Sequence, residues 1–102
     1  KLWIAFAADS QGAVVIDDGA ADAVRTRGTS LLHAGVRSVS GQFLVGDVVD
    51  VLDGTGALIA RGVVSVDGDA ATASAGQRSD QLGEVVPSEL IHRDDLVVMP
   101  SA

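Results

Sequence analysis

The chain has 102 residues and a formal net charge of −7, with one Trp, two Phe and neither Tyr nor Cys. The length is typical of a single domain, and the lack of cysteine excludes disulfides and thiolate metal sites, which is compatible with a cytoplasmic location. So few aromatic rings argue against a base-stacking single-strand binder, and the negative charge opposes a polyanion at long range while leaving room for a local basic patch.

The first residues, KLWIAFA, place a lysine before a short apolar run, as a signal peptide does. The run is too short for a signal peptide of roughly 15–30 residues, and no stretch approaches the roughly 18 apolar residues of a membrane span. The sequence also begins at Lys1 rather than at a methionine. We therefore expect a piece of a longer protein without a membrane partner, and we expect residues 2–7 to form a first strand.

The next segment changes from a strand to a helix. A second strand is predicted at residues 13–17, after a polar turn at residues 9–12. Asp17 or Asp18 can then accept hydrogen bonds from the free N–H groups of a helix start. Apolar residues recur at helical spacing as far as Gly28, which is placed to end a helix of about ten residues.

Short strands punctuated by glycines follow the helix. The predicted strands are residues 31–32, 36–43, 48–52, 57–66, 90–92 and 96–99. Residues 53–56, DGTG, predict a hairpin, and Gly62 predicts a bulge or barrel corner within its strand. Four glycines are interpreted as structural turn positions, namely Gly28, Gly35, Gly46 and Gly62.

Two further helical elements are predicted in the last third of the chain. Residues 69–75, followed by Gly76, predict a second short helix, and Ser79 is placed to cap a single helical turn. We expect six to seven of these segments to form short strands, with one principal helix between the second and the third, which indicates a mainly β fold with short helices. We expect a small curled sheet or pseudobarrel.

Four motifs occur in the order DGA (18–20), RGTSLLHAGV (27–36), GDVV (46–49) and ARGV (60–63). Together they resemble a PUA domain, a small pseudobarrel best known as an appendage of RNA-modifying enzymes. Within that class, KLWI (1–4), SVSG (38–41) and HRDDL (92–96) are more similar to the C-terminal PUA domain of bacterial glutamate 5-kinases. The resemblance covers residues 1–102 as one domain and is weakest from 69 to 88.

The resemblance implies an accessory role in a longer enzyme. Glutamate 5-kinases transfer a phosphoryl group from ATP, with magnesium, to the γ-carboxylate of L-glutamate, the first step toward proline. Their catalytic residues belong to an N-terminal amino-acid-kinase domain, so we assign no catalytic residue and no cofactor to this chain. The expected partners are that kinase domain and further copies of the parent enzyme. The domain would pack beside the kinase domain, shape the oligomer or modulate regulation by proline.

A basic cluster stands out in this acidic chain. In RNA-binding PUA domains the region from the helix into the next strand contacts RNA, so the resemblance makes Arg25, Arg27, Thr29, His33 and Arg37 candidate contacts for RNA or another anion. In the structural alternative, Arg25 and Arg27 stabilise the C-terminal end of the helix dipole and Arg37 pairs with a carboxylate. We favour this alternative, because an acidic chain offers few phosphate contacts. An RNA-binding module of a modification enzyme or translation factor is the competing function.

Other motifs carry no chemistry of their own. Residues 92–95, HRDD, begin like the catalytic loop of protein kinases, but Met99 stands where that loop has its magnesium-binding Asn. The paired aspartates at 17–18, 67–69 and 94–95 lack the spacing of a calcium loop. Residues 54–56, GTG, fit neither a dinucleotide fingerprint nor a phosphate loop. We therefore expect turns and helix caps at these positions, and no metal site.

Overall fold

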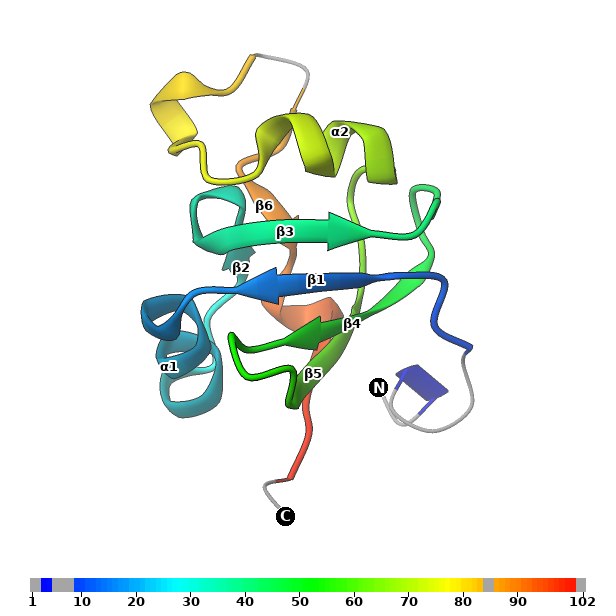
Figure 1. Cartoon of the computed structure of the whole chain (residues 1–102), viewed down its shortest axis with the longest axis vertical. Helices are drawn as coiled ribbons and strands as arrows, with labels where there is room; N and C mark the ends of the chain where they lie inside the picture. The colour runs from blue at the N-terminus through cyan, green and yellow to red at the C-terminus, as the bar shows by residue number, and fades with distance from the viewer. Residues whose placement is uncertain (1–2, 5–8, 84–85, 101–102) are drawn as a thin grey trace.

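The computed structural model describes residues 3–4, 9–83 and 86–100, and this part of the chain is mainly β (Figure 1). Its strands are β1 (Ala13–Ile16), β2 (Leu31–Leu32), β3 (Val36–Ser40), β4 (Val48–Leu52), β5 (Leu58–Val63), β6 (Glu89–Ile91) and β7 (Leu96–Val98). Its helices are α1 (Asp18–Arg27) and α2 (Gly68–Ser74), with single 3₁₀ turns at His33–Gly35, Ser79–Gln81 and Arg93–Asp95. The predicted mainly β fold with one principal helix is confirmed.

Two sheets form the framework. The larger has the order β3-β1-β4-β5-β7, in which β1 and β4 run parallel and the other neighbours run antiparallel. The smaller sheet pairs β2 with β6, which are far apart in sequence. In Figure 1, α2 lies along β3, and α1 lies beyond the end of β1. The larger sheet thus combines strands from the beginning, middle and end of the chain. The curled arrangement encloses one apolar core, formed by the buried residues of the described elements.

The start and end of α1 follow from two residues. Asp17 is the N-cap, and its Oδ1 accepts a hydrogen bond from the N–H of Ala20 at 2.7 Å. Gly28 ends the helix with φ of 60°, a left-handed conformation that a side chain would penalise. Between them, Ala21 and Val24 are buried against the core. The predicted helix and its end at Gly28 are confirmed, and of the two possible caps the structure has Asp17.

The hairpin between β4 and β5 is organised by one carboxylate. Asp53 Oδ1 accepts hydrogen bonds from the hydroxyl of Thr55 at 2.6 Å and from the N–H groups of Thr55 and Ala57 at 2.9 and 3.1 Å. The Thr55 hydroxyl, above all, lowers the pKa of Asp53, with help from these N–H groups and the charge of Arg25. Arg25 Nη2 lies 3.8 Å from Asp53 Oδ2 and so links α1 to the hairpin.

Several predicted boundaries were wrong. The strand expected at 36–43 ends at Ser40, because the chain turns at Gly41 and carries Phe43 into the core. Ser79 is the first residue of its 3₁₀ turn, and the cap position belongs to Arg78. The strand expected at 2–7 falls largely outside the described residues, and neither Trp3 nor Ile4 lies in a strand.

Gly62 is not a bulge. It pairs in regular register with Val49 on β4 and with Leu96 on β7, while the irregularity between β4 and β5 falls at Val51 and Leu52. A Cβ atom at position 62 would lie 2.6 Å from Cγ2 of Ile91 and 2.9 Å from the carbonyl oxygen of Asp95. Glycine is therefore required because β6 and the segment after it cross close to β5.

Candidate functional site

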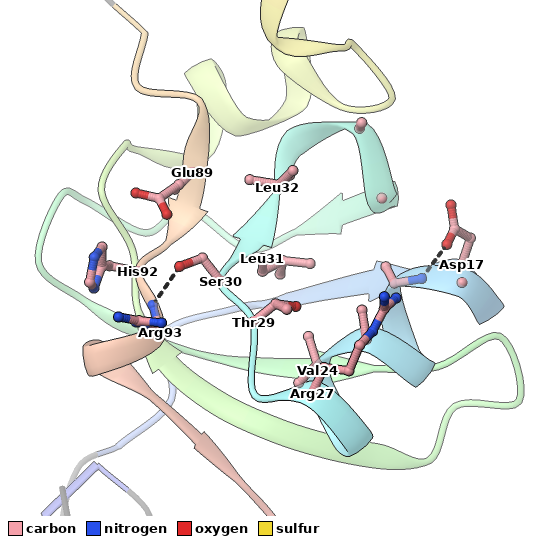
Figure 2. Close-up of a pocket in the computed structure, with 15 residues that line it drawn as sticks. Asp17, Val24, Arg27, Thr29, Ser30, Leu31, Leu32, Glu89, His92 and Arg93 are labelled. Carbon is pink, nitrogen blue, oxygen red and sulfur yellow. Dashed lines mark hydrogen bonds between the residues drawn. The ribbon is translucent and has the colours of Figure 1, made fainter.

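A groove of about 730 Å³ lies between α1 and the two-stranded sheet of β2 and β6 (Figure 2). One wall is the face of α1 that carries Ala20, Ala23 and Arg27. The floor is the segment from Thr29 through β2, and the opposite wall is the stretch from β6 to the 3₁₀ turn that follows it. The groove therefore combines segments from the first third and the end of the chain.

The wall opposite α1 is held by a hydrogen bond between distant residues. The N–H of Arg93 donates to Oγ of Ser30 at 2.8 Å, and Figure 2 shows this bond joining the wall to the groove floor. Next to it, Nδ1 of His92 accepts a hydrogen bond from the N–H of Asp94 at 3.1 Å and caps the 3₁₀ turn. The exposed side chains of His92 and Arg93 are thereby placed beside the groove on a hydrogen-bonded backbone.

The charges around the groove are mixed. Arg27 and Arg93 provide guanidinium groups, which can hold a carboxylate or a phosphate through paired N–H donors. Asp17 and Glu89 also line the groove and reduce its net positive charge. Asp17 is already bound to the N–H of Ala20 as the helix cap. The arrangement suits a small anion or a mixed polar ligand better than a long polyanion.

The structure brings together two of the five residues predicted to contact an anion. Arg27 and Thr29 line the groove, and Arg27 forms no ion pair with any described residue. Arg25 instead pairs with Asp53 at the hairpin, and Arg37 is an exposed residue of β3 away from the groove. Whether Arg27 and Thr29 bind a ligand stays a prediction.

His33, the fifth candidate, is buried with only 1% of its surface exposed. Within the described part of the chain, neither ring nitrogen forms a hydrogen bond of normal geometry. Burial lowers the pKa of His33, and the nearby carbonyl of Pro87 opposes this shift in part. His33 is therefore a buried residue that does not line the groove and is not placed to touch a ligand.

Sequence reasoning missed several groove residues. Ser30 and Glu89 had not been predicted as site residues, and His92 and Arg93 had been interpreted only as turn residues. Polar residues are frequent in residues 88–95, SELIHRDD, which include β6, and this could have indicated a binding surface. Only the pairing of β2 with β6 brings this stretch next to α1. Of the predicted turn glycines, Gly35 lines the groove, where it ends the 3₁₀ turn. Gly46 turns the chain into β4 and does not line the groove.

The described residues contain neither a metal-ligand cluster nor a membrane-spanning helix. Residues 3–4, 9–83 and 86–100 contain no group of three or more His, Cys, Asp or Glu side chains that could hold a metal ion. In the same residues, neither helix has the length and apolar character needed to cross a membrane.

Comparison with known sequences identifies relatives over nearly the whole chain. The model of the PUA domain family matches residues 12–86. The glutamate 5-kinase of Nocardia farcinica is 46% identical over 97 residues, which cover 95% of this chain and 26% of that protein. The glutamate 5-kinase of Dictyoglomus thermophilum is 42% identical over 103 residues, covering 97% of this chain and 28% of that protein. The chain thus spans about a quarter of the length of these curated relatives.

Solved structures agree on the fold. A PUA domain from Aeropyrum pernix K1, solved as a tartrate complex, is 40% identical with a TM-score of 0.57, and the match covers 60% of this chain and 33% of that one. NSun6 from Pyrococcus horikoshii has a TM-score of 0.61 at 21% identity, covering 92% of this chain and 22% of that protein. The second likeness concerns the fold alone.

Proposed function

The chain belongs to the PUA domain family, and from that premise we propose that it is the C-terminal accessory domain of a glutamate 5-kinase. The observation that carries the proposal is 46% identity over 95% of the chain to a protein about four times as long. A match over 95% of the chain takes in most of the core and most of the groove. The parent enzyme would phosphorylate the γ-carboxylate of L-glutamate with ATP.

We place the chemistry of the parent outside these residues. ATP and magnesium would bind to the amino-acid-kinase domain that the resemblance implies, and the groove beside α1 would take no part in phosphoryl transfer. The contribution of the domain would be to pack beside the kinase domain, to shape the oligomer or to modulate inhibition by proline. Each of these roles predicts that removing the domain changes the behaviour of the enzyme without abolishing the reaction.

The test compares three proteins: the parent enzyme, the parent without this domain and the 102-residue chain alone. We expect glutamate-dependent ADP release from the first two and none from the chain alone. The truncated enzyme should differ from the parent in oligomeric mass or in the proline concentration that halves its rate. ATP turnover by the chain alone, or a parent that does not phosphorylate glutamate, would contradict the proposal.

A second function, anion or RNA binding in the groove, is favoured by two observations. Arg27 and Arg93 lie on opposite sides of an open groove, and the related Aeropyrum pernix domain was solved as a tartrate complex. We expect Arg27→Ala to weaken binding of tartrate or of a structured RNA at low salt. A matched control is Arg25→Ala, because Arg25 is bound to Asp53 outside the groove.

The two ligands separate the possible outcomes of this titration. Tartrate binding that is lost in Arg27→Ala and kept in Arg25→Ala supports a small-anion site. RNA binding at micromolar concentration that needs both Arg27 and Arg37 would instead support the RNA-binding alternative. Equal binding by wild type and Arg27→Ala, for both ligands, would refute a ligand site in the groove.

A further inference from the structure

The outer face of the β4–β5 hairpin carries a charged pair that is largely withdrawn from water. Asp50 and Arg61 lie opposite each other in the antiparallel register, and Arg61 Nε donates to Asp50 Oδ1 at 3.0 Å. The side chain of Arg61 is only 11% exposed and that of Asp50 35%. Because Val49 and Val51 point into the core, the pair points to the opposite face of the sheet.

Ile4 contacts this face of the hairpin. Arg61 Nη1 donates a hydrogen bond to the carbonyl oxygen of Ile4 at 2.9 Å. Ile4 is only 3% exposed, yet it does not belong to the main core cluster. Among the described buried hydrophobic residues, only Val48 is likewise buried outside that cluster. Ile4 is therefore buried outside the core, at the outer face of the hairpin. Trp3, its neighbour, is 54% exposed.

The chemistry of the contact suits an anchor. An arginine that is mostly shielded from water needs a counter-ion and acceptors for its N–H groups, because an unpaired charge there is costly. Asp50 supplies the counter-ion from the neighbouring strand, and the Ile4 carbonyl supplies an acceptor from a distant segment. The rigid pair can therefore hold that segment by its backbone, whatever side chains the segment carries.

We propose that the outer face of the β4–β5 hairpin, centred on Arg61, is the seat for the chain segment that enters the domain at Trp3 and Ile4. By holding this segment, Arg61 would set the orientation of the domain on the remainder of a longer enzyme. The orientation role rests on the proposed function, whereas the seat for Trp3 and Ile4 concerns this chain alone.

Trp3 is the single tryptophan of the sequence and reports directly on the seat. In Arg61→Met, which keeps an apolar stem but removes the N–H donors, we expect lower fluorescence anisotropy and stronger quenching of Trp3 by acrylamide. Because Trp3 is already 54% exposed, its release can raise the quenching constant by at most about twofold. Asp50→Asn should act in the same direction by a smaller amount, since it leaves Arg61 in place.

The control is Arg78→Met, because the Arg78 side chain is 73% exposed and its ion-pair partner among the described residues is the equally exposed Asp80 at 3.6 Å. Its Trp3 signal should equal that of the wild type. Circular dichroism establishes that each variant is folded, and Asp50→Asn decides the matter if Arg61→Met does not fold. If Arg61→Met folds and shows the quenching and anisotropy of the wild type, the proposal is overturned. If Arg61→Met does not fold, wild-type quenching and anisotropy in Asp50→Asn would overturn it.

The orientation role is tested in the parent enzyme by limited chymotrypsin digestion at the entry to the domain. We expect Arg61→Met to speed cleavage there by about tenfold, because a hydrogen bond to a charged group no longer holds the segment closed. Unchanged cleavage together with a released Trp3 would refute the orientation role while leaving the seat intact. Neither measurement uses kinase activity, so each stands or falls separately from the proposed function.

Discussion

Gly62→Ala is expected to lower the free energy of unfolding by about 1–3 kcal/mol, the usual cost of overpacking a closely fitted interior. The added Cβ would lie 2.6 Å from Cγ2 of Ile91, a branched and fully buried side chain, and 2.9 Å from the backbone oxygen of Asp95. Neither neighbour can move without shifting β6 or the turn that follows it. Gly62→Val should cost more, a large share of the roughly 5–15 kcal/mol that stabilises a domain.

Urea unfolding followed by circular dichroism measures this cost. Gly54→Ala is the matched control, because Gly54 has open space around it and no positive φ, and it should change stability by less than about 0.5 kcal/mol. Ile91→Ala removes the nearest clashing atoms, so the double variant with Gly62→Ala should be more stable than the sum of the single changes by about 0.5–3 kcal/mol. Equal stability of Gly62→Ala and Gly54→Ala would show that the strands do not cross closely.

His33→Leu is expected to stabilise the domain, and most strongly below pH 6.5. Among the described residues, neither nitrogen of the buried imidazole has a hydrogen-bond partner of normal geometry, and an unsatisfied buried polar group costs about 1–3 kcal/mol. Burial also lowers the pKa of His33 below 6.5 in the folded state, so the unfolded chain binds this proton more readily. Wild-type stability should therefore be intact above pH 6.5 and decline as the pH falls through the unfolded pKa. Protonation of this one group can lower the free energy of unfolding by at most about 1.4 kcal/mol per pH unit.

Urea unfolding at several pH values between 5 and 8 separates this effect from other titrations. His33→Leu should lose the decline that the wild type shows between pH 6.5 and 5. His92→Gln is the control, since His92 is 47% exposed at its side chain, and it should keep the wild-type decline. The pKa of Asp53 lies below its ordinary value of 3.8, so its titration falls outside this window. A His33→Leu variant with the wild-type decline would contradict the account.

Local elements of the fold were predictable because neighbouring residues create them. Asp17 starts α1 through a side-chain hydrogen bond, and Gly28 ends it through a left-handed backbone angle. Both are properties of those residues themselves. Asp53 likewise closes the hairpin, because its Oδ1 accepts hydrogen bonds from N–H donors that lie no more than four residues along the chain. Boundaries were less accurate at Ser40, where the turn at Gly41 ends a strand that the apolar pattern would extend.

The candidate groove was predictable only in part. The basic residues after α1 could be singled out from the sequence, and Arg27 and Thr29 do line the groove. The same reasoning placed His33 and Arg37 beside them, because sequence distance cannot tell which way a side chain points after a 3₁₀ turn. Arg93 was missed because it meets Ser30 across 63 residues of chain.

The sequence by itself determined the class of the domain, its principal helix, its main hairpin and its membership of the PUA family, because these depend on local hydrogen bonding and on motif order. Only the tertiary structure decided that Gly62 is a crossing point and that Arg61 holds Ile4 rather than facing water. Both depend on which distant strands become neighbours. That choice is made by burial of the whole core, a collective free energy that no short segment carries.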